Sequence, residues 1–151
     1  MKIRAAEDKD SDEIKSVVFE VLKEYGLSPD PGNTDLDLNS IEEYYHKNGG
    51  FFGVVEDEGA IVATVGIYRV DSSTCELRKM YALPNQRGRG LGKTLMEFTI
   101  KTAKELGFSR ITLETASPLR EAIALYQKYG FKEYTPAHMA SRCDQAFELC
   151  L

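Results

Sequence analysis

The sequence predicts one mixed α/β (α+β) domain, built on a mostly antiparallel sheet that contains a single parallel strand pair. Helical and strand periods along the 151-residue chain give the order β-α-α-β-β-β-α-β-α-β-β. Short turns join the three central strands as an antiparallel meander, whereas a helix connects the last of them to the next strand. A right-handed crossover makes that last pair parallel. The length suits a single domain over residues 1–151.

A short strand at 2–5 and an amphipathic helix are expected first. Asp10 and Glu13 have the spacing of a capping box, which predicts that the helix begins there. Apolar residues then recur on one helical face until Gly26, which is typical of a helix end. This helix should pack its apolar face on the sheet.

A segment rich in Asp and Pro at 28–39 is predicted to be irregular, and Ser40 can cap a short helix after it. The runs that follow are rich in β-branched and aromatic residues. Glu-Asp-Glu-Gly at 56–59 and Asp-Ser-Ser at 71–73 interrupt them, which indicates hairpin turns. The three strands are predicted at 51–55, 61–70 and 75–82.

The second half of the chain alternates helices and strands. Helical spacing continues from Leu91 to Gly107, where glycine closes the helix. Ser117-Pro118 has the composition of an N-cap followed by proline in the first turn, and predicts a helix that Gly130 ends. The remaining strands are predicted at 110–115, 132–134 and 146–151.

The turn at 80–92 joins a strand to a helix and contains glycines at alternate positions, Gly88, Gly90 and Gly92. Glycine tolerates backbone angles that let successive N–H groups point at one place. The positive end of the following helix also attracts anions. The sequence therefore predicts a cradle for a phosphate-bearing ligand.

Two common phosphate-binding patterns fit this turn poorly. Gly92-Lys93-Thr94 matches the end of a P-loop, but the first glycine of that motif would fall on Arg87. In a dinucleotide-binding turn counted from Gly88, the third glycine would fall on Lys93, although Glu114 could imitate the ribose-binding acid. A nucleotide-binding P-loop protein stays a minor alternative.

The hexapeptide Arg87-Gly88-Arg89-Gly90-Leu91-Gly92 resembles the R-G-x-G-x-G turn of the GNAT superfamily of acetyl-CoA-dependent N-acetyltransferases. Residues 119–131 likewise resemble that superfamily's helix pattern N-x-x-A-x-x-L-Y-x-x-x-G-F. The resemblance covers nearly the whole chain. It implies helices on both faces of the sheet, a parallel central strand pair that splays apart, and acetyl-CoA bound with its pyrophosphate on the glycine turn.

One position departs from the pattern. The superfamily's usual asparagine, which contacts the pantetheine arm, is Leu119 here, and Ser117 is a candidate replacement. The resemblance also implies that backbone groups of Met80 and Ala82 pair with the pantetheine arm and polarise the thioester oxygen. Arg87 and Arg89 can pair with phosphates. Lys93 and Thr94 are secondary candidates, with ordinary solvation as the alternative. The predicted cofactor-binding residues are Met80, Tyr81, Ala82, Arg87, Gly88, Arg89, Gly90, Leu91, Gly92, Lys93 and Ser117.

Catalytic roles follow from the same resemblance. Tyr126 matches the superfamily's acid beside the sulfur, and with an ordinary pKa of about 10 it carries a proton at neutral pH. The alternative is a tyrosine packed on an amphipathic helix. Glu76 is the first candidate for the base that deprotonates the amine, and its alternative is an ion pair with Arg78 or Lys79. Glu114 is a second carboxylate, expected to orient water or bind the acceptor.

The acceptor pocket is expected to form from the region 28–45 and the last loop, where solvated loop residues are the alternative for each member. Tyr45 is a candidate contact for a cationic amine, and Arg142 suits a substrate carboxylate. Cys143 is a weaker candidate, because transfer in a ternary complex needs no nucleophilic residue.

Composition limits the other functions. A net charge of −5 without a basic stripe argues against nucleic-acid binding, and two distant histidines give no support to a metal site. Three cysteines without C-x-x-C spacing suit a reducing compartment. The N-terminus lacks an apolar signal core and no run reaches membrane-spanning length, so we expect a cytoplasmic protein that does not associate with membranes.

We therefore expect an N-acetyltransferase that uses acetyl-CoA and acts on a primary amine of a small molecule by direct attack. One alternative is an acyl-CoA-binding sensor or a catalytically weak module. Another is an acetyltransferase for a protein N-terminus or lysine. The sequence does not determine whether the protein forms a homodimer.

Overall fold

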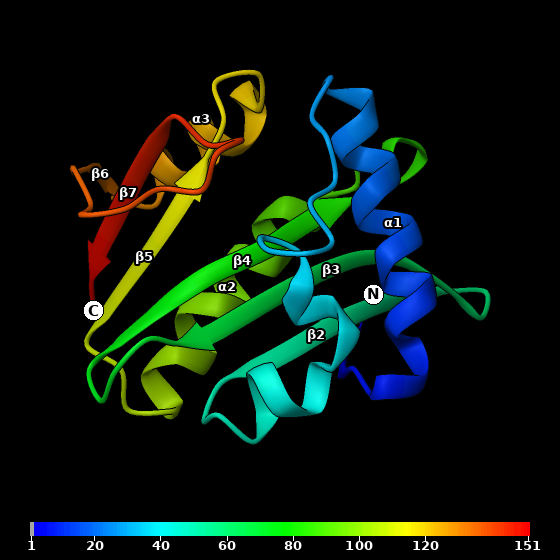
Figure 1. Cartoon of the computed structure of the whole chain (residues 1–151), viewed down its shortest axis with the longest axis horizontal. Helices are drawn as coiled ribbons and strands as arrows, with labels where there is room; N and C mark the ends of the chain where they lie inside the picture. The colour runs from blue at the N-terminus through cyan, green and yellow to red at the C-terminus, as the bar shows by residue number, and fades with distance from the viewer. Residues whose placement is uncertain (1) are drawn as a thin grey trace.

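A computed structural model describes residues 2–151, which form a seven-stranded sheet with helices on both faces (Figure 1). The strand order is β1-β2-β3-β4-β5-β7-β6. The strands are β1 Ile3–Ala5, β2 Phe51–Asp57, β3 Ala60–Arg69, β4 Thr74–Ala82, β5 Arg110–Thr115, β6 Lys132–Glu133 and β7 Gln145–Cys150. The helices are α1 Ser11–Glu24, α2 Leu91–Glu105 and α3 Arg120–Lys128. Single turns of 3-10 helix lie at Asp8–Asp10, Leu36–Asn39 and Pro84–Gln86, and a π-helical turn spans Glu42–His46.

All strand pairs are antiparallel except β4 and β5, which confirms the predicted sheet. Those two strands pair only at their beginnings, where residues 74–76 face residues 110–112. Beyond that point β5 stays with β7 along its full length and leaves β4, as the diverging arrows of Figure 1 show. The sheet therefore splays open between the C-terminal halves of β4 and β5.

A bulge in β4 lies at the edge of this opening. The register of β3 and β4 shifts between Thr64 and Gly66, and Lys79 opposite it adopts a left-handed φ of 54°. Non-glycine residues rarely adopt this conformation, so it needs support from its surroundings. The buried Thr64 hydroxyl donates a hydrogen bond of 2.7 Å to the Lys79 carbonyl and fixes the bulge.

Two hydrophobic cores flank the sheet. On one face α1 and the π-helical turn cover β2 and β3, with Ile14, Leu22 and Phe52 among the fully buried side chains. On the other face α2 and α3 cover β3, β4 and β5, with Leu95 and Met96 at the centre. Alternate side chains of each strand enter opposite cores. The apolar face predicted for the first helix is therefore confirmed.

The predicted hairpin turn and helix ends are also confirmed. Glu58 and Gly59 both have positive φ, 51° and 82°, as a tight hairpin between twisted strands requires. Gly26, Gly107 and Gly130 follow α1, α2 and α3 in left-handed conformations and end these helices as predicted.

Three predicted helix caps are wrong. Asp10 accepts a hydrogen bond from the Glu7 N–H and pairs with Arg4, while Glu13 accepts from the Ile61 N–H, so no capping box opens α1. Ser117 likewise caps no helix, because α3 begins later and its side chain bonds elsewhere. Glu13 and Ser117 bond to partners distant in the chain, whereas Asp10 bonds to its neighbours Arg4 and Glu7.

The short helix after residue 40 is a π-helical turn, Glu42–His46. The Asp8 carboxylate accepts a 3.0 Å hydrogen bond from the Glu42 N–H at its start, the position that the sequence assigned to Ser40. Among residues 2–151, no helix is long and apolar enough to span a lipid bilayer.

Candidate functional site

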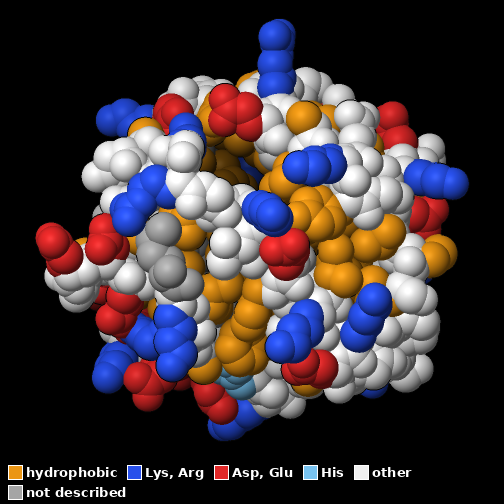
Figure 2. Space-filling view, turned by 180° about the vertical axis from the view of Figure 1, so that it is seen from behind, with side chains coloured by type: hydrophobic (Ala, Val, Ile, Leu, Met, Phe, Trp, Pro, Cys, Tyr) orange, Lys and Arg blue, Asp and Glu red, His pale blue; other side chains and the backbone are white. Residues whose placement is uncertain are grey.

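Two adjoining clefts open where β4 and β5 separate. We call the first the cradle cleft; it has a volume of about 280 Å³ and lies beside the start of α2. The second, the splay cleft, has a volume of about 400 Å³ and lies between β4 and β5. Met80, Tyr81, Leu119 and Ala122 line both, so the two clefts adjoin along β4. Figure 2 shows a hollow lined by hydrophobic side chains, with charged groups at its rim, on the side of the sheet that α2 and α3 cover.

The cradle cleft is built around unsatisfied backbone N–H groups. No described residue accepts a hydrogen bond from the N–H groups of residues 88–93, and the first bond at the start of α2 is from the Thr94 N–H to the Gly90 carbonyl, at 3.0 Å. Gly88 and Gly90 have φ of 79° and 76°. A side chain at either position would meet no atom within 4 Å, so both face open space. Free donors at a helix start form a site for an anion.

The charged residues of the predicted cradle have protein partners. Arg87 lines the cradle cleft but donates to Glu24 at 2.5 and 2.8 Å and to the Ala82 carbonyl at 3.1 Å. These contacts tie the glycine turn to the end of α1. Arg89 turns away toward Gln86, and neither it nor Lys93 lines a cleft. The predicted cofactor residues that line the cradle cleft are Met80, Tyr81, Ala82, Arg87, Gly88, Gly90, Leu91 and Gly92.

Tyr126 lies on α3 and faces the splay cleft. Its ring packs against Phe131 and Phe147, with ring centroids 5.9 and 6.2 Å away. Burial, with smaller effects of Tyr81 and Cys143, raises the Tyr126 pKa above its ordinary value. The hydroxyl therefore keeps its proton at neutral pH, in a cavity where a reacting group can reach it.

Glu76 and Arg78 lie two residues apart on β4 and both line the splay cleft. The Arg78 Nε–H donates to the Glu76 carboxylate, and the two form an ion pair. This is one of the pairings considered for Glu76 from the sequence. The Arg78 guanidinium also stacks on the Tyr68 ring, 3.8 Å from its centroid. Both side chains are therefore held in place at the point where the strands part.

Glu114 lies on β5, across the cleft from these two residues. Its Oε1 accepts a 2.8 Å hydrogen bond from the Ala140 N–H. Burial raises the Glu114 pKa, the nearby Glu76 raises it further, and the hydrogen bond and Arg78 oppose both effects. The pKa of Glu114 is raised toward neutrality, which suits a proton acceptor.

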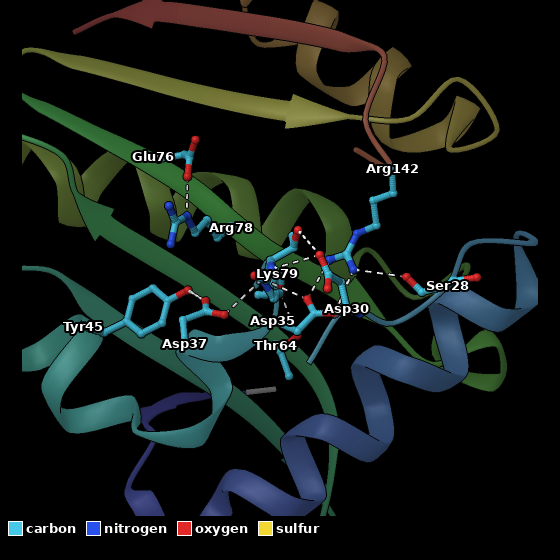
Figure 3. A network of polar contacts seen from close by, with 11 residues as sticks. Ser28, Asp30, Asp35, Asp37, Tyr45, Thr64, Glu76, Arg78, Lys79 and Arg142 are labelled. Carbon is cyan, nitrogen blue, oxygen red and sulfur yellow. Dashed lines mark hydrogen bonds and ion pairs between the residues drawn. The ribbon is translucent and has the colours of Figure 1, made fainter. Parts of the chain in front are cut away.

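A buried ionic network, shown in Figure 3, fixes one wall of the splay cleft. The Lys79 ammonium lies 3.3 Å from both Asp35 and Asp37 and donates to the Thr34 carbonyl at 3.1 Å. Asp35 also accepts two hydrogen bonds of 2.7 Å from Arg142. The network thus joins the β4 bulge to the 28–39 segment and to the loop before β7.

The structure separates the predicted acceptor residues. Glu114 and Arg142 line the splay cleft, but the Arg142 guanidinium is already bound to Asp35. Tyr45 is fully buried between Phe52 and Tyr68, donates to Asp37, and lines neither cleft. The predicted acceptor contact of Tyr45 is therefore wrong, because its ring is needed in the core.

Ser117 also lies outside both clefts. Its hydroxyl donates to Asp144 at 2.5 Å, and its N–H donates to the same carboxylate at 2.9 Å. Its role is to join the start of α3 to the loop before β7. Leu119 lines both clefts and replaces the expected polar contact with an apolar surface.

Two cleft residues were missed as functional groups in the sequence. Arg78 follows Glu76 by two positions, so the strand period alone puts both side chains on one face. That spacing was the available signal. Lys79 was not identifiable, because its burial depends on a bulge that no local pattern marks.

Comparisons with known proteins show the family and the fold. The family model described as "Acetyltransferase (GNAT) family" matches residues 18–131. "Uncharacterized N-acetyltransferase YjgM" of Escherichia coli K12 is 43% identical over 129 residues, covering 82% of this chain and 77% of that protein.

Solved structures share the fold. A GNAT-family acetyltransferase of Staphylococcus aureus Mu50 has a TM-score of 0.89 at 24% identity, covering 97% of this chain and 96% of its own. A phosphinothricin acetyltransferase of Sinorhizobium meliloti in complex with AcCoA has a TM-score of 0.76 at 20% identity, covering 99% and 88%. At these identities the likeness describes the fold.

Proposed function

Because the chain belongs to the acetyltransferase (GNAT) family, we propose that it transfers the acetyl group of acetyl-CoA to a primary amine of a small molecule by direct attack in a ternary complex. The observation that carries the proposal is the row of free N–H groups at residues 88–93, in a cleft that adjoins the one lined by Tyr126 and the two cleft carboxylates. A phosphate site and proton-transfer groups thus lie in adjoining clefts.

The residues present fit the pyrophosphate of coenzyme A. The cradle offers consecutive backbone donors and no acidic side chain on its glycine turn, and a Cβ at Gly88 or Gly90 would occupy the open space of the cradle. Met80 and Ala82, which line the cradle cleft, are placed to hold the pantetheine arm through their backbone groups. When bound, acetyl-CoA supplies the acetyl group as a thioester, whose C–S bond breaks as the amine nitrogen bonds to the carbonyl carbon.

The chain's carboxylates would remove the proton that the amine must lose. An alkylamine such as lysine has a pKa of about 10.4 and is mostly charged at neutral pH. Glu76 was the first candidate for this task from the sequence. We favour Glu114, because Glu76 is already paired with Arg78, whereas Glu114 has no cationic partner among the described residues and a pKa raised by burial, which suits a proton acceptor.

Tyr126 would supply the proton that the departing thiolate requires. Its raised pKa keeps the hydroxyl protonated, and its position on α3 turns it toward the splay cleft. Cys143 lines the same cleft, but burial raises its pKa to about 11, so its thiol stays protonated at neutral pH. A nucleophilic cysteine needs a thiolate, and this supports direct attack by the amine.

The shape of the splay cleft supports a small acceptor. Its volume of about 400 Å³ is bounded by both central strands, α3 and the loop at 138–143, so the carboxylates lie inside a confined space. Cavities of this size suit small molecules. An amine presented on a folded protein surface would have to enter it on an extended segment.

A thiol-release assay with acetyl-CoA and a panel of amines tests the proposal. The panel should contain small amines, a lysine-containing peptide and a peptide with a free N-terminus, with coenzyme A affinity measured by calorimetry. We expect saturable binding and turnover on small amines. Binding without turnover on any acceptor would favour an acyl-CoA sensor, and turnover restricted to peptides would favour a protein substrate.

A further inference from the structure

Three side chains with permanent positive charge line the splay cleft: Arg78, Lys79 and Arg142. Two of them are neutralised by the protein. Lys79 has only 4% of its side chain exposed and lies between Asp35 and Asp37, and Arg142 makes its two-point contact with Asp35. The two positive charges of this network are balanced by the negative charges of Asp35 and Asp37. It fixes the wall of the cleft and leaves little charge for a ligand.

Arg78 differs from these two residues. Glu76 accepts from its Nε–H, the Tyr45 hydroxyl is within hydrogen-bond reach of the guanidinium, and its side chain is 31% exposed. The Tyr68 ring supports the guanidinium plane at 3.8 Å. A guanidinium has four terminal N–H donors, and one hydroxyl cannot use all of them. An arginine held in this way keeps donors for a planar anion such as a carboxylate.

Negatively charged side chains lie near Arg78 in the same cleft. Glu76, Arg78 and Glu114 line the same cleft, and both Glu76 and Arg78 are close enough to Glu114 to act on its pKa, Glu76 raising it and Arg78 lowering it. Glu76 is paired with Arg78, so Glu114 is the cleft carboxylate without a cationic partner among the described residues. A positive and a negative site therefore lie side by side at the inner end of the cleft.

From this arrangement we propose that the acceptor is a free amino acid, with its carboxylate on Arg78 and its ammonium group facing Glu114. This inference rests on the proposed acetyl transfer and narrows its substrate class. In an amino acid the two charged groups are attached to one carbon, so one compact site must bind both. Arg78, Glu76 and Glu114 provide such a site where β4 and β5 part.

Other amines fit this site less well. A polyamine or amino sugar would place only positive charge beside Arg78, which costs energy in a partly buried site. The N-terminus of a protein and the side chain of a lysine residue carry no carboxylate beside the amine. Each would leave the remaining N–H donors of Arg78 without an acceptor once water is displaced, and unpaired buried donors are unfavourable.

The first experiment compares matched acceptors with the wild-type enzyme. Free amino acids are measured against their amides and against the amines that lack the carboxylate, for example phenylalanine, phenylalaninamide and phenethylamine. We expect kcat/KM for the free amino acids to be higher by about 10- to 100-fold, the value of a hydrogen-bonded charge contact. Equal kcat/KM for the three would overturn this inference and leave the proposed acetyl transfer intact. No turnover on any amine would overturn both.

The second experiment assigns the preference to Arg78. Arg78→Lys keeps the charge but loses the forked donors, and Arg78→Met loses both. The preference for the carboxylate should fall with Lys and vanish with Met, while coenzyme A affinity stays unchanged. Arg110 is a matched control, because it also lies on a strand, donates its Nε–H to a glutamate at 2.8 Å and stacks on a tyrosine, outside both clefts. Arg110→Met should keep the preference.

A preference that survives Arg78→Met in folded protein, as judged by circular dichroism and retained coenzyme A binding, would refute the assignment. If Arg78→Met does not fold, Arg78→Lys tests the assignment instead. The quantity to compare with wild type is kcat/KM for the free amino acid divided by kcat/KM for its amide. Loss of the preference in Arg110→Met to the same degree would also count against it, since the effect would then not be specific to the cleft.

Discussion

Arg142 and Asp35 lie 107 residues apart in the chain and meet in a two-point ion pair, with both N–O distances at 2.7 Å. Asp35 comes from the irregular segment after α1, and Arg142 comes from the loop before β7. Their contact draws the two sides of the splay cleft together, and Lys79 anchors it to the bulge of β4. The cleft wall is therefore held by charges that are almost completely removed from water.

Asp35→Asn should lower the free energy of unfolding by about 3 kcal/mol, because it removes one partner of a buried ionic network. Urea unfolding of both proteins measures this difference. Glu43→Gln is the control, since its pair with Lys47 is exposed at 3.7 Å and should change stability by less than about 1 kcal/mol. Equal effects of the two substitutions would contradict the structural role of the network.

The Asp35 contribution should depend on pH. Burial opposes ionisation of Asp35, but the hydrogen bonds from Arg142 and the Asp30 N–H, with the charge of Lys79, outweigh it and lower its pKa. A lowered folded-state pKa stabilises the protein above the unfolded pKa of about 3.9, and this stabilisation is lost as the pH falls through the folded value. The difference between wild type and Asp35→Asn should therefore shrink below about pH 4. If the difference in unfolding free energy instead grew as the pH fell, the lowered pKa of Asp35 would be contradicted.

Gly90→Glu should abolish coenzyme A binding, because the side chain would enter the cradle and carry negative charge toward the phosphates. Calorimetry measures the affinity. Gly59→Glu is a matched control: Gly59 also has a positive φ, 82° against 76°, and open space around it, but lies in the β2–β3 turn. Both variants carry the same backbone strain, so only the cradle variant should lose binding. Unchanged affinity in Gly90→Glu would refute the assigned phosphate site.

Tyr126→Phe should reduce kcat by about 10²-fold or more with little change in coenzyme A affinity, because it removes a proton donor and keeps the ring packing. Steady-state kinetics and calorimetry separate the two effects. Tyr129→Phe, at the end of the same helix and outside both clefts, should leave kcat unchanged. An unaltered rate in Tyr126→Phe would remove its acid role.

The acid limb of the pH profile should report Glu114. A base must be ionised, so kcat/KM should fall as the pH drops through the Glu114 pKa, which lies above the ordinary value of 4.5. Glu76→Gln removes the negative charge that helps to raise this pKa and should move the limb to lower pH. Glu114→Gln should remove the limb and reduce kcat by about 10²-fold. A limb that stays in Glu114→Gln but vanishes in Glu76→Gln would assign the base to Glu76.

Local chemistry determined much of this protein. The strand and helix periods, the hairpin at Glu58-Gly59 and the glycines that end the helices depend on neighbours in the sequence, so they were predictable. The same holds for the cradle, because glycines at the start of a helix leave a row of backbone donors without acceptors in the helix. The antiparallel β2-β3-β4 meander and the parallel β4-β5 pair followed from the short turns and the one crossover helix.

The tertiary structure alone decided how the charged side chains are used. Asp10, Glu13 and Ser117 had cap-like spacing, but Glu13 and Ser117 bond to partners far along the chain, and Asp10 bonds to Arg4 and Glu7 just before it. Arg142 had the chemistry to bind a substrate, yet both of its terminal nitrogens are bound to Asp35, whereas the ion pair of Arg78 with Glu76 uses Nε. A long polar side chain can reach several partners of similar energy, and only the folded arrangement determines which of them displaces water.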